Sequence, residues 1–173
     1  CAISNIKFSV NFADVVAMVT VTGTDFMLED CLFTAAAVNM NWVDVIDCSG
    51  GDNTADGLTV VNNQAFDLDT NNDSFIEITG DIDRLTVHNN FVVHDNANAT
   101  SFIEQAAGKK MINVSIKSNS YQSLLTALDV LVLNDQTTNS GEAAYNLAGH
   151  ADTGSEILVD ATGVGMFQNF GTG

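Results

Sequence analysis

A short sequence occurs twice in this chain, and the repeat constrains the fold more than any other feature. Residues 58–66 read LTVVNNQAF and residues 85–93 read LTVHNNFVV, so the two copies begin 27 residues apart. A repeat of this period predicts stacked structural units, because one unit cannot bury its apolar side chains alone and must pack against its neighbours.

Weaker copies extend the repeat over most of the chain. CAISNIKF opens the sequence, FMLEDCLF begins at Phe26 and VSIKSNSY begins at Val114, which makes the successive intervals 25, 32, 27 and 29 residues. A second alternating run follows each copy: MVTVTG, WVDVID, FIEITG, FIEQAAG and the less regular ALDVLVLND. Alternation of apolar and polar residues at a period of two marks half-buried strands. The sequence therefore predicts an all-β chain with about five coils of 25–32 residues over residues 1–135.

The chain holds nineteen Asn residues, and they gather where the predicted strands turn. Asn tolerates the left-handed backbone conformation that sharp turns need. Asn63, Asn90 and Asn119 occupy the same position in three successive units. Stacking would bring their side chains to about 4.8 Å from one another, close enough for a ladder of amide hydrogen bonds. The alternative is three separate turn residues.

Three features of this chain resemble the right-handed parallel β-helix, the pectate-lyase-like solenoid. They are the repeated LTVVNN and LTVHNN, the SFIEITGD and SFIEQAAG that follow them, and the Asn column. The resemblance covers about residues 1–135 and implies a right-handed solenoid of parallel strands. In addition, the ending GVGMFQNFGTG is similar to the tail regions of uncharacterised β-helix proteins of marine tailed bacteriophages.

The two ends of the chain differ from the repeat. Residues 136–173 are rich in Gly and small residues, and they are predicted to form a final irregular coil, a cap or a contact with another subunit. At the other end, Cys1 falls in register with the inward positions of the first coil. We therefore expect this chain to be an excerpt of a longer polypeptide, with a mature lipoprotein as the alternative.

The charge balance argues against several partners. With 22 acidic and 5 basic residues, the net charge of −17 repels phosphate backbones and anionic lipid surfaces. The apolar runs also fall short of the roughly 18 residues that a membrane span requires. We expect no nucleic-acid or membrane partner and, from the resemblance, an extracellular or virion location.

The three Cys residues, Cys1, Cys31 and Cys48, show no metal-binding spacing such as CxxC. Cys31 lies in the predicted column that also holds Ile6 and Asn63. A free Cys in such a column is expected to be a small buried apolar residue.

One acidic cluster has the spacing of a calcium loop. DLDTNNDS places an oxygen ligand at every second residue, which suits a hard cation such as Ca²⁺. The predicted ligands are Asp67, Asp69, Asn71 and Asp73. An EF-hand would require Gly in place of Asn72 and Glu in place of Ile78, so the alternative is an ordinary solvated turn.

A second acidic cluster arises when the second strands of the coils are stacked. Four carboxylates are predicted to share one outward column: Asp44, Glu77, Glu104 and Asp129. At about 5 Å apart these carboxylates would repel one another. Bound cations, raised carboxylate pKa values or an imperfect register would have to reduce this repulsion. A separation of about 5 Å between two carboxylates would also match the catalytic pair of retaining glycoside hydrolases. A glycan is therefore the alternative ligand of this column.

The signatures of β-helix enzymes are incomplete here. Polygalacturonases resemble one another in motifs of the types NTD, DD, GHG and RIK, and the only near match is GHAD at Gly149 and His150. Arg84 is the single Arg, and its neighbours Asp81 and Asp83 predict a surface ion pair. His88 and His94 are expected to be exposed turn or surface residues. The sequence therefore leans away from an enzyme.

Together these features favour a structural or adhesive, non-catalytic virion component, such as a head decoration, a fibre or a tailspike shaft. Its expected partners are two further copies in a homotrimer and other virion proteins. One alternative is a carbohydrate-active solenoid, either a polysaccharide depolymerase or a glycan-binding spike. Another is a bacterial surface adhesin or filament subunit.

Overall fold

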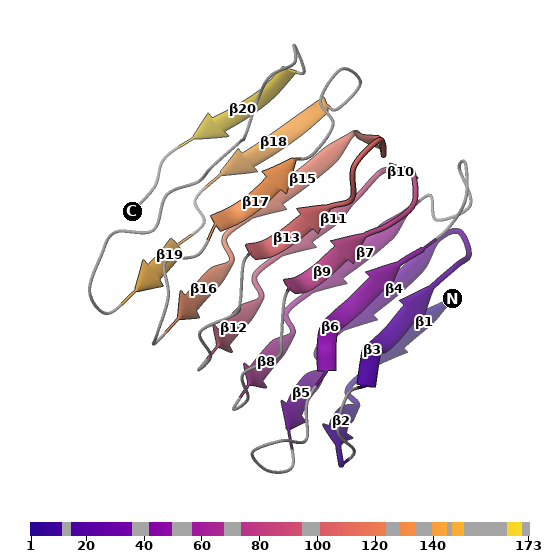
Figure 1. Cartoon of the computed structure of the whole chain (residues 1–173), viewed down its shortest axis with the longest axis vertical. Coiled ribbons are helices and arrows are strands. Elements are labelled where there is room, and N and C mark those ends of the chain that lie inside the picture. Colours follow the sequence, from indigo (N-terminus) through magenta and orange to yellow (C-terminus); the bar gives the residue numbers. More distant parts are fainter. Residues whose placement is uncertain are drawn as a thin grey trace.

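The computed structural model describes residues 1–11, 15–35, 42–49, 57–67, 74–94, 101–123, 129–133, 140–144, 147–150 and 166–170. Within these ranges the chain is all-β, and no helix long and apolar enough to cross a membrane is present. Its strands stack in order along one direction, from β1 to β20 (Figure 1).

Three long sheets build the molecule, and every strand pairing in them is parallel. Sheet A contains, in order, β1 (Ala2–Ser4), β4 (Phe26–Glu29), β7 (Leu58–Val61), β11 (Thr86–His88), β15 (Val114–Lys117), β18 (Ser140–Ala144) and β20 (Met166–Phe170). Sheet B contains β2 (Lys7–Val10), β5 (Leu32–Ala35), β8 (Gln64–Asp67), β12 (Phe91–His94), β16 (Ser120–Ser123) and β19 (Leu147–His150).

Sheet C contains β3 (Val15–Val21), β6 (Trp42–Cys48), β9 (Ser74–Ile78), β13 (Ser101–Gln105) and β17 (Asp129–Leu133). The short strands β10 (Ile82–Asp83) and β14 (Met111–Ile112) form a fourth, two-stranded sheet. The chain visits sheets A, B and C in turn and then returns to A, so the molecule is a β-solenoid of stacked coils.

In sheet A the register is the one that the repeat predicts. Phe26 lies beside Leu58, and the next inward column runs through Leu28, Val60, Val87 and Ile116. The sheets also continue beyond residue 135, since β18 pairs with β15 and β19 pairs with β16. Within residues 136–173, the described strands β18, β19 and β20 extend sheets A and B.

Four strands of sheet A, β4, β7, β11 and β15, each lie between two residues with left-handed backbone. The residues before the strands are Asp25, Gly57, Arg84 and Asn113, with φ of 52°, 78°, 65° and 54°. The residues after the strands are Asp30, Asn62, Asn89 and Ser118, with φ of 53°, 58°, 57° and 56°. Gly, Asn and Asp adopt this conformation most readily, which explains their place at these corners.

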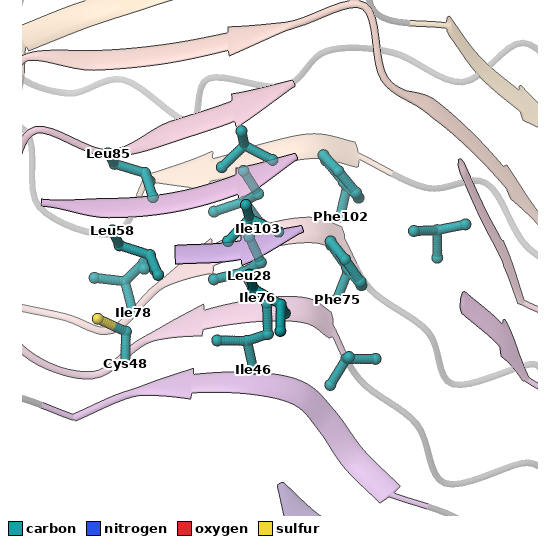
Figure 2. Close-up of a cluster of buried hydrophobic side chains, with 14 of the residues drawn as sticks. Leu28, Ile46, Cys48, Leu58, Phe75, Ile76, Ile78, Leu85, Phe102 and Ile103 are labelled. Carbon is teal, nitrogen blue, oxygen red and sulfur yellow. The ribbon is translucent and has the colours of Figure 1, made fainter. Parts of the chain in front are cut away.

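The core consists of columns of like residues contributed by successive coils. Figure 2 shows Ile46, Ile76 and Ile103 above one another, and Phe75 stacked beneath Phe102 with ring centroids 5.2 Å apart. All five of these side chains are fully buried. Burying each of them is worth about 1.5–3 kcal/mol, and most of that gain depends on the coil above or below.

Candidate functional site

The structure brings Asn63, Asn90 and Asn119 together in one buried column. Asn90 Oδ1 accepts hydrogen bonds from the Asn63 amide N and Nδ2 at 2.9 and 3.0 Å. Asn119 Oδ1 accepts the same two bonds from Asn90, both at 2.9 Å. At most 2% of each residue is exposed, so the column holds coils together and leaves no surface for a ligand.

The same amides also bind the coil on the opposite side. Asn63 Nδ2 donates to the Leu28 carbonyl at 3.1 Å, and Asn119 Nδ2 donates to the Val87 carbonyl at 2.9 Å. Each side chain thereby satisfies backbone groups that a sharp turn would otherwise leave buried and unpaired.

Cys31 occupies the next position of this column. Its backbone N donates to Asn63 Oδ1 at 2.9 Å, and its Sγ lies 3.3 Å from the Glu29 carbonyl oxygen. Only 2% of Cys31 is exposed and its thiol is free, so it has the buried environment that the sequence predicts.

The predicted column of four carboxylates has a different register in the structure. Glu77 does lie beside Glu104, but the neighbour of Glu77 in β6 is Asp47. On the other side, Glu104 lies beside Val132, while Asp129 lies beside Ser101. The placement of Asp44 and Asp129 in the same column as Glu77 is therefore wrong.

The physical reason is a break in the alternation of sheet C. β9 and β13 each begin with three consecutive buried residues, and Asp44, Val45 and Ile46 of β6 are buried in the same way. The outward position follows this run, so in β6 it falls on Asp47 rather than on Asp44. Period-two counting that takes Val43 and Val45 as inward places Asp44 outward and misses Asp47.

Asp44 belongs instead to a buried polar column. It is 2% exposed, and its Oδ1 accepts a hydrogen bond from the Ser74 backbone N at 3.2 Å. Ser74 Oγ lies 3.3 Å from Ser101 Oγ, and the Tyr121 hydroxyl donates to the Ser101 carbonyl at 2.6 Å. This column is internal and supports the corner between two sheets.

The predicted calcium ligands fall mostly outside the described residues. Asp67 ends β8, with its backbone alone described, and Asp69, Asn71 and Asp73 lie outside the described ranges. The calcium site therefore stays a prediction. Within the described part of the chain, no group of three His, Cys, Asp or Glu residues is placed to hold a metal ion.

An open groove of about 530 Å³ lies at the corner that precedes sheet A, and we call it the corner groove. Met27, Thr59 and Thr86 are neighbours in β4, β7 and β11 and form one row of its lining. The left-handed corner residues form a second row, which consists of Asp25, Gly57, Arg84 and Asn113. Phe26 completes the lining.

Arg84 crosses one coil to reach its ionic partner in this groove. Its Nη2 lies 3.2 Å from Asp25 Oδ1, although the two residues are 59 positions apart in the sequence. Gly57 lies between them, and a Cβ added there would approach Asp25 Oδ1 to 2.6 Å. The ion pair thus passes over a position where a side chain would obstruct it.

The acidic neighbours of Arg84 in the sequence have partners of their own. Asp81 Oδ2 lies 3.7 Å from Lys110 Nζ, and Asp83 Oδ1 accepts a hydrogen bond from Asn113 Nδ2 at 2.7 Å. Proximity in the sequence predicts Asp81 and Asp83 as ion-pair partners of Arg84. In the stacked coils the ion-pair partner of Arg84 is Asp25.

His88 lies on the outer face of sheet A and is half-buried. Its Nε2 is 3.0 Å from Ser115 Oγ. Burial lowers the pKa of His88, the nearby Lys117 lowers it further, and Glu142 opposes them. The side chain of His94 lies outside the described residues.

Comparisons with protein families, curated proteins and solved structures found no match to this chain.

Proposed function

We propose that this chain is a structural or adhesive section of a right-handed β-solenoid in a virion component such as a head decoration, a fibre or a tailspike shaft. The observation that carries the proposal is the unbroken parallel stacking of sheets A, B and C. Stacked coils form a long, stiff element whose length grows with the number of coils, and a shaft requires this property.

The handedness and the coil count are part of the proposal. Parallel strands joined by a crossover connection are right-handed in about 98% of cases, because of the twist of the strands. Together with the repeat intervals of 25, 32, 27 and 29 residues, this supports a right-handed solenoid with about five coils in residues 1–135.

The buried polar columns support a mechanical role over a catalytic one. Asn63, Asn90 and Asn119 link successive coils through side-chain hydrogen bonds in addition to the backbone bonds of the sheets. Such buried bonds hold the register, since leaving a buried partner unpaired costs about 1–3 kcal/mol. A shaft that transmits force would benefit from this resistance to slippage.

The proposed setting is extracellular or virion-associated, with a homotrimer and other virion proteins as partners. The resemblance to phage β-helix proteins supports this setting. The net charge of −17 favours solubility and attracts cations such as Ca²⁺ to the surface.

Electron microscopy of native particles labelled with an antibody to this chain tests the proposal. We expect label on the heads, fibres or tails of virions in a lysate that contains the chain. Label confined to bacterial surfaces or filaments would overturn the virion assignment in favour of an adhesin. Release of new reducing ends from polysaccharides by the purified chain would overturn the non-catalytic assignment.

A further inference from the structure

We propose that the corner groove binds a neutral, hydroxyl-rich oligosaccharide. This inference deepens the adhesive part of the proposed function and rests on that part alone, since a glycan site could serve a virion or a cell surface equally. The volume of the corner groove, about 530 Å³, lies within the range of about 300–1,000 Å³ that is usual for sites of small ligands.

The lining residues of the groove recur at regular steps along the solenoid. Met27 lies beside Thr59, and Thr59 lies beside Thr86, so this row advances by one strand spacing, about 4.8 Å, per coil. The row of corner residues advances in the same way. A ligand that follows the groove therefore meets the lining residues of a new coil about every 4.8 Å, and each of these coils contributes at least one polar side chain.

This spacing favours a chain of sugar rings over a peptide. An extended peptide advances by only about 3.3–3.4 Å per residue, so its side chains would fall out of step with the groove. A pyranose ring with its glycosidic oxygen is longer than one peptide residue and is close to one strand spacing in length.

The lining offers both hydrogen-bond donors and acceptors. The guanidinium of Arg84 only donates and the carboxylate of Asp25 only accepts, while Thr59, Thr86 and Asn113 can do both. Sugar hydroxyls also donate and accept, so they can be satisfied by such a mixed lining. Met27, which is 38% exposed, adds an apolar surface for the C–H face of a ring.

The charges beside the groove argue against an acidic ligand. The charge of Arg84 is balanced by Asp25 at 3.2 Å, and Asp83 contacts Asn113 at 2.7 Å. With the net charge of −17 on the whole chain, the groove carries no surplus of positive charge to attract a carboxylate or phosphate. A neutral glycan avoids this repulsion.

Titration of the ¹⁵N-labelled chain with neutral tetrasaccharides, followed by NMR, tests the inference. The probes are β-1,4-linked tetramers of glucose and of N-acetylglucosamine and α-linked tetramers of glucose and of mannose. Tetragalacturonate serves as the acidic control and tetraglycine as the peptide control. We expect at least one neutral tetramer to cause saturable shifts at Thr59, Thr86 and the Arg84 Nε–H, with weaker effects from both controls.

Thr86→Val tests the contribution of a single lining hydroxyl to binding, because it keeps the β-branched shape and removes only that hydroxyl. Loss of one hydrogen bond predicts a dissociation constant about 2- to 10-fold higher. Thr34→Val in β5 is the matched control, since Thr34 is a half-buried strand residue outside the groove, and it should leave binding unchanged.

Absence of saturable binding by every neutral tetramer would overturn the inference, as would tighter binding of tetragalacturonate. Equal binding by the wild type and Thr86→Val would also overturn it, provided that far-UV circular dichroism shows the same fold. These outcomes leave the shaft proposal intact, because that proposal is tested by the location of the chain on native particles.

Discussion

At the scale of single residues, two adjacent asparagines have different roles at the same turn. Asn89 is exposed and has φ of 57°, so it turns the backbone at the corner between β11 and β12. Asn90 is 1% exposed, and its side chain links its coil to the two neighbouring coils. The repeated Asn-Asn pair therefore combines a conformational requirement with a hydrogen-bonding requirement.

Asn90→Ala should destabilise the fold strongly. The change leaves the amide N and Nδ2 of Asn63 without their acceptor and also empties the volume of the buried side chain. With about 1–3 kcal/mol for each unpaired buried group, we expect a loss of about 2–5 kcal/mol in the free energy of unfolding. Guanidinium chloride unfolding, followed by circular dichroism, measures this loss.

Asn89→Gly is the matched control for this prediction, because Gly adopts positive φ without strain and Asn89 is exposed. It should change the free energy of unfolding by less than about 1 kcal/mol. Similar losses in the two variants would contradict the separate roles assigned to the two residues.

Gly57→Ala should also destabilise the chain, for two local reasons. Its φ of 78° is unfavourable for Ala, and the new Cβ would lie 2.6 Å from Asp25 Oδ1. We expect a loss of about 1–3 kcal/mol. Gly23→Ala is the control, since its new Cβ has no atom within 4 Å, and a thermal melt that ranks the two variants in the reverse order would refute the account.

At the scale of elements, the strands of sheet C show how a local break in alternation moves a whole column. The run of three buried residues in β6, β9 and β13 places Asp47, Glu77 and Glu104 on the outer face. It also places Asp44 inside, against the backbone of Ser74. The element therefore separates carboxylates that look equivalent in the sequence.

A double-mutant cycle can test this register. Asp47→Asn and Glu77→Gln should show a coupling energy of about 0.2–1 kcal/mol at low salt, because the two carboxylates are directly opposite in neighbouring strands. The cycle of Asp44→Asn with Glu77→Gln should show a smaller coupling. A larger coupling for Asp44 than for Asp47, measured by urea unfolding, would contradict the register.

At the scale of the whole molecule, the stacked coils concentrate negative charge on a long surface. Five basic residues balance few of the 22 acidic ones, and only part of the repulsion is relieved by pairs such as Lys117 with Glu142. The folded solenoid brings carboxylates of successive coils closer together than they are in the unfolded chain. Self-repulsion therefore opposes folding at low ionic strength.

Raising NaCl from about 0.01 M to 0.15 M should raise the Tm at pH 7, since the Debye length falls from about 30 Å to 8 Å. Differential scanning calorimetry measures the change. The effect should shrink at pH 4.5, close to the sequence pI of about 4.1, where the net charge is small. A Tm that falls with salt at pH 7 would show that ion pairs outweigh the repulsion.

The sequence by itself determined the all-β class, the repeat and the register of sheet A. It could do so because the left-handed corner residues, and the four residues that each pair of them encloses, are local features that recur in successive coils. The Asn column at Asn63, Asn90 and Asn119 follows from the same local pattern, because each Asn comes directly after a left-handed residue.

Only the tertiary structure decided the register of sheet C, the Arg84–Asp25 pair and the corner groove. The intervals between coils vary from 25 to 32 residues, so the sequence alone does not say which residues far from the Asn corner become neighbours. Contacts such as that between Asp25 and Arg84 arise from two coils that meet across a third. They depend on how the backbone stacks in space, because no local preference of either residue specifies the other.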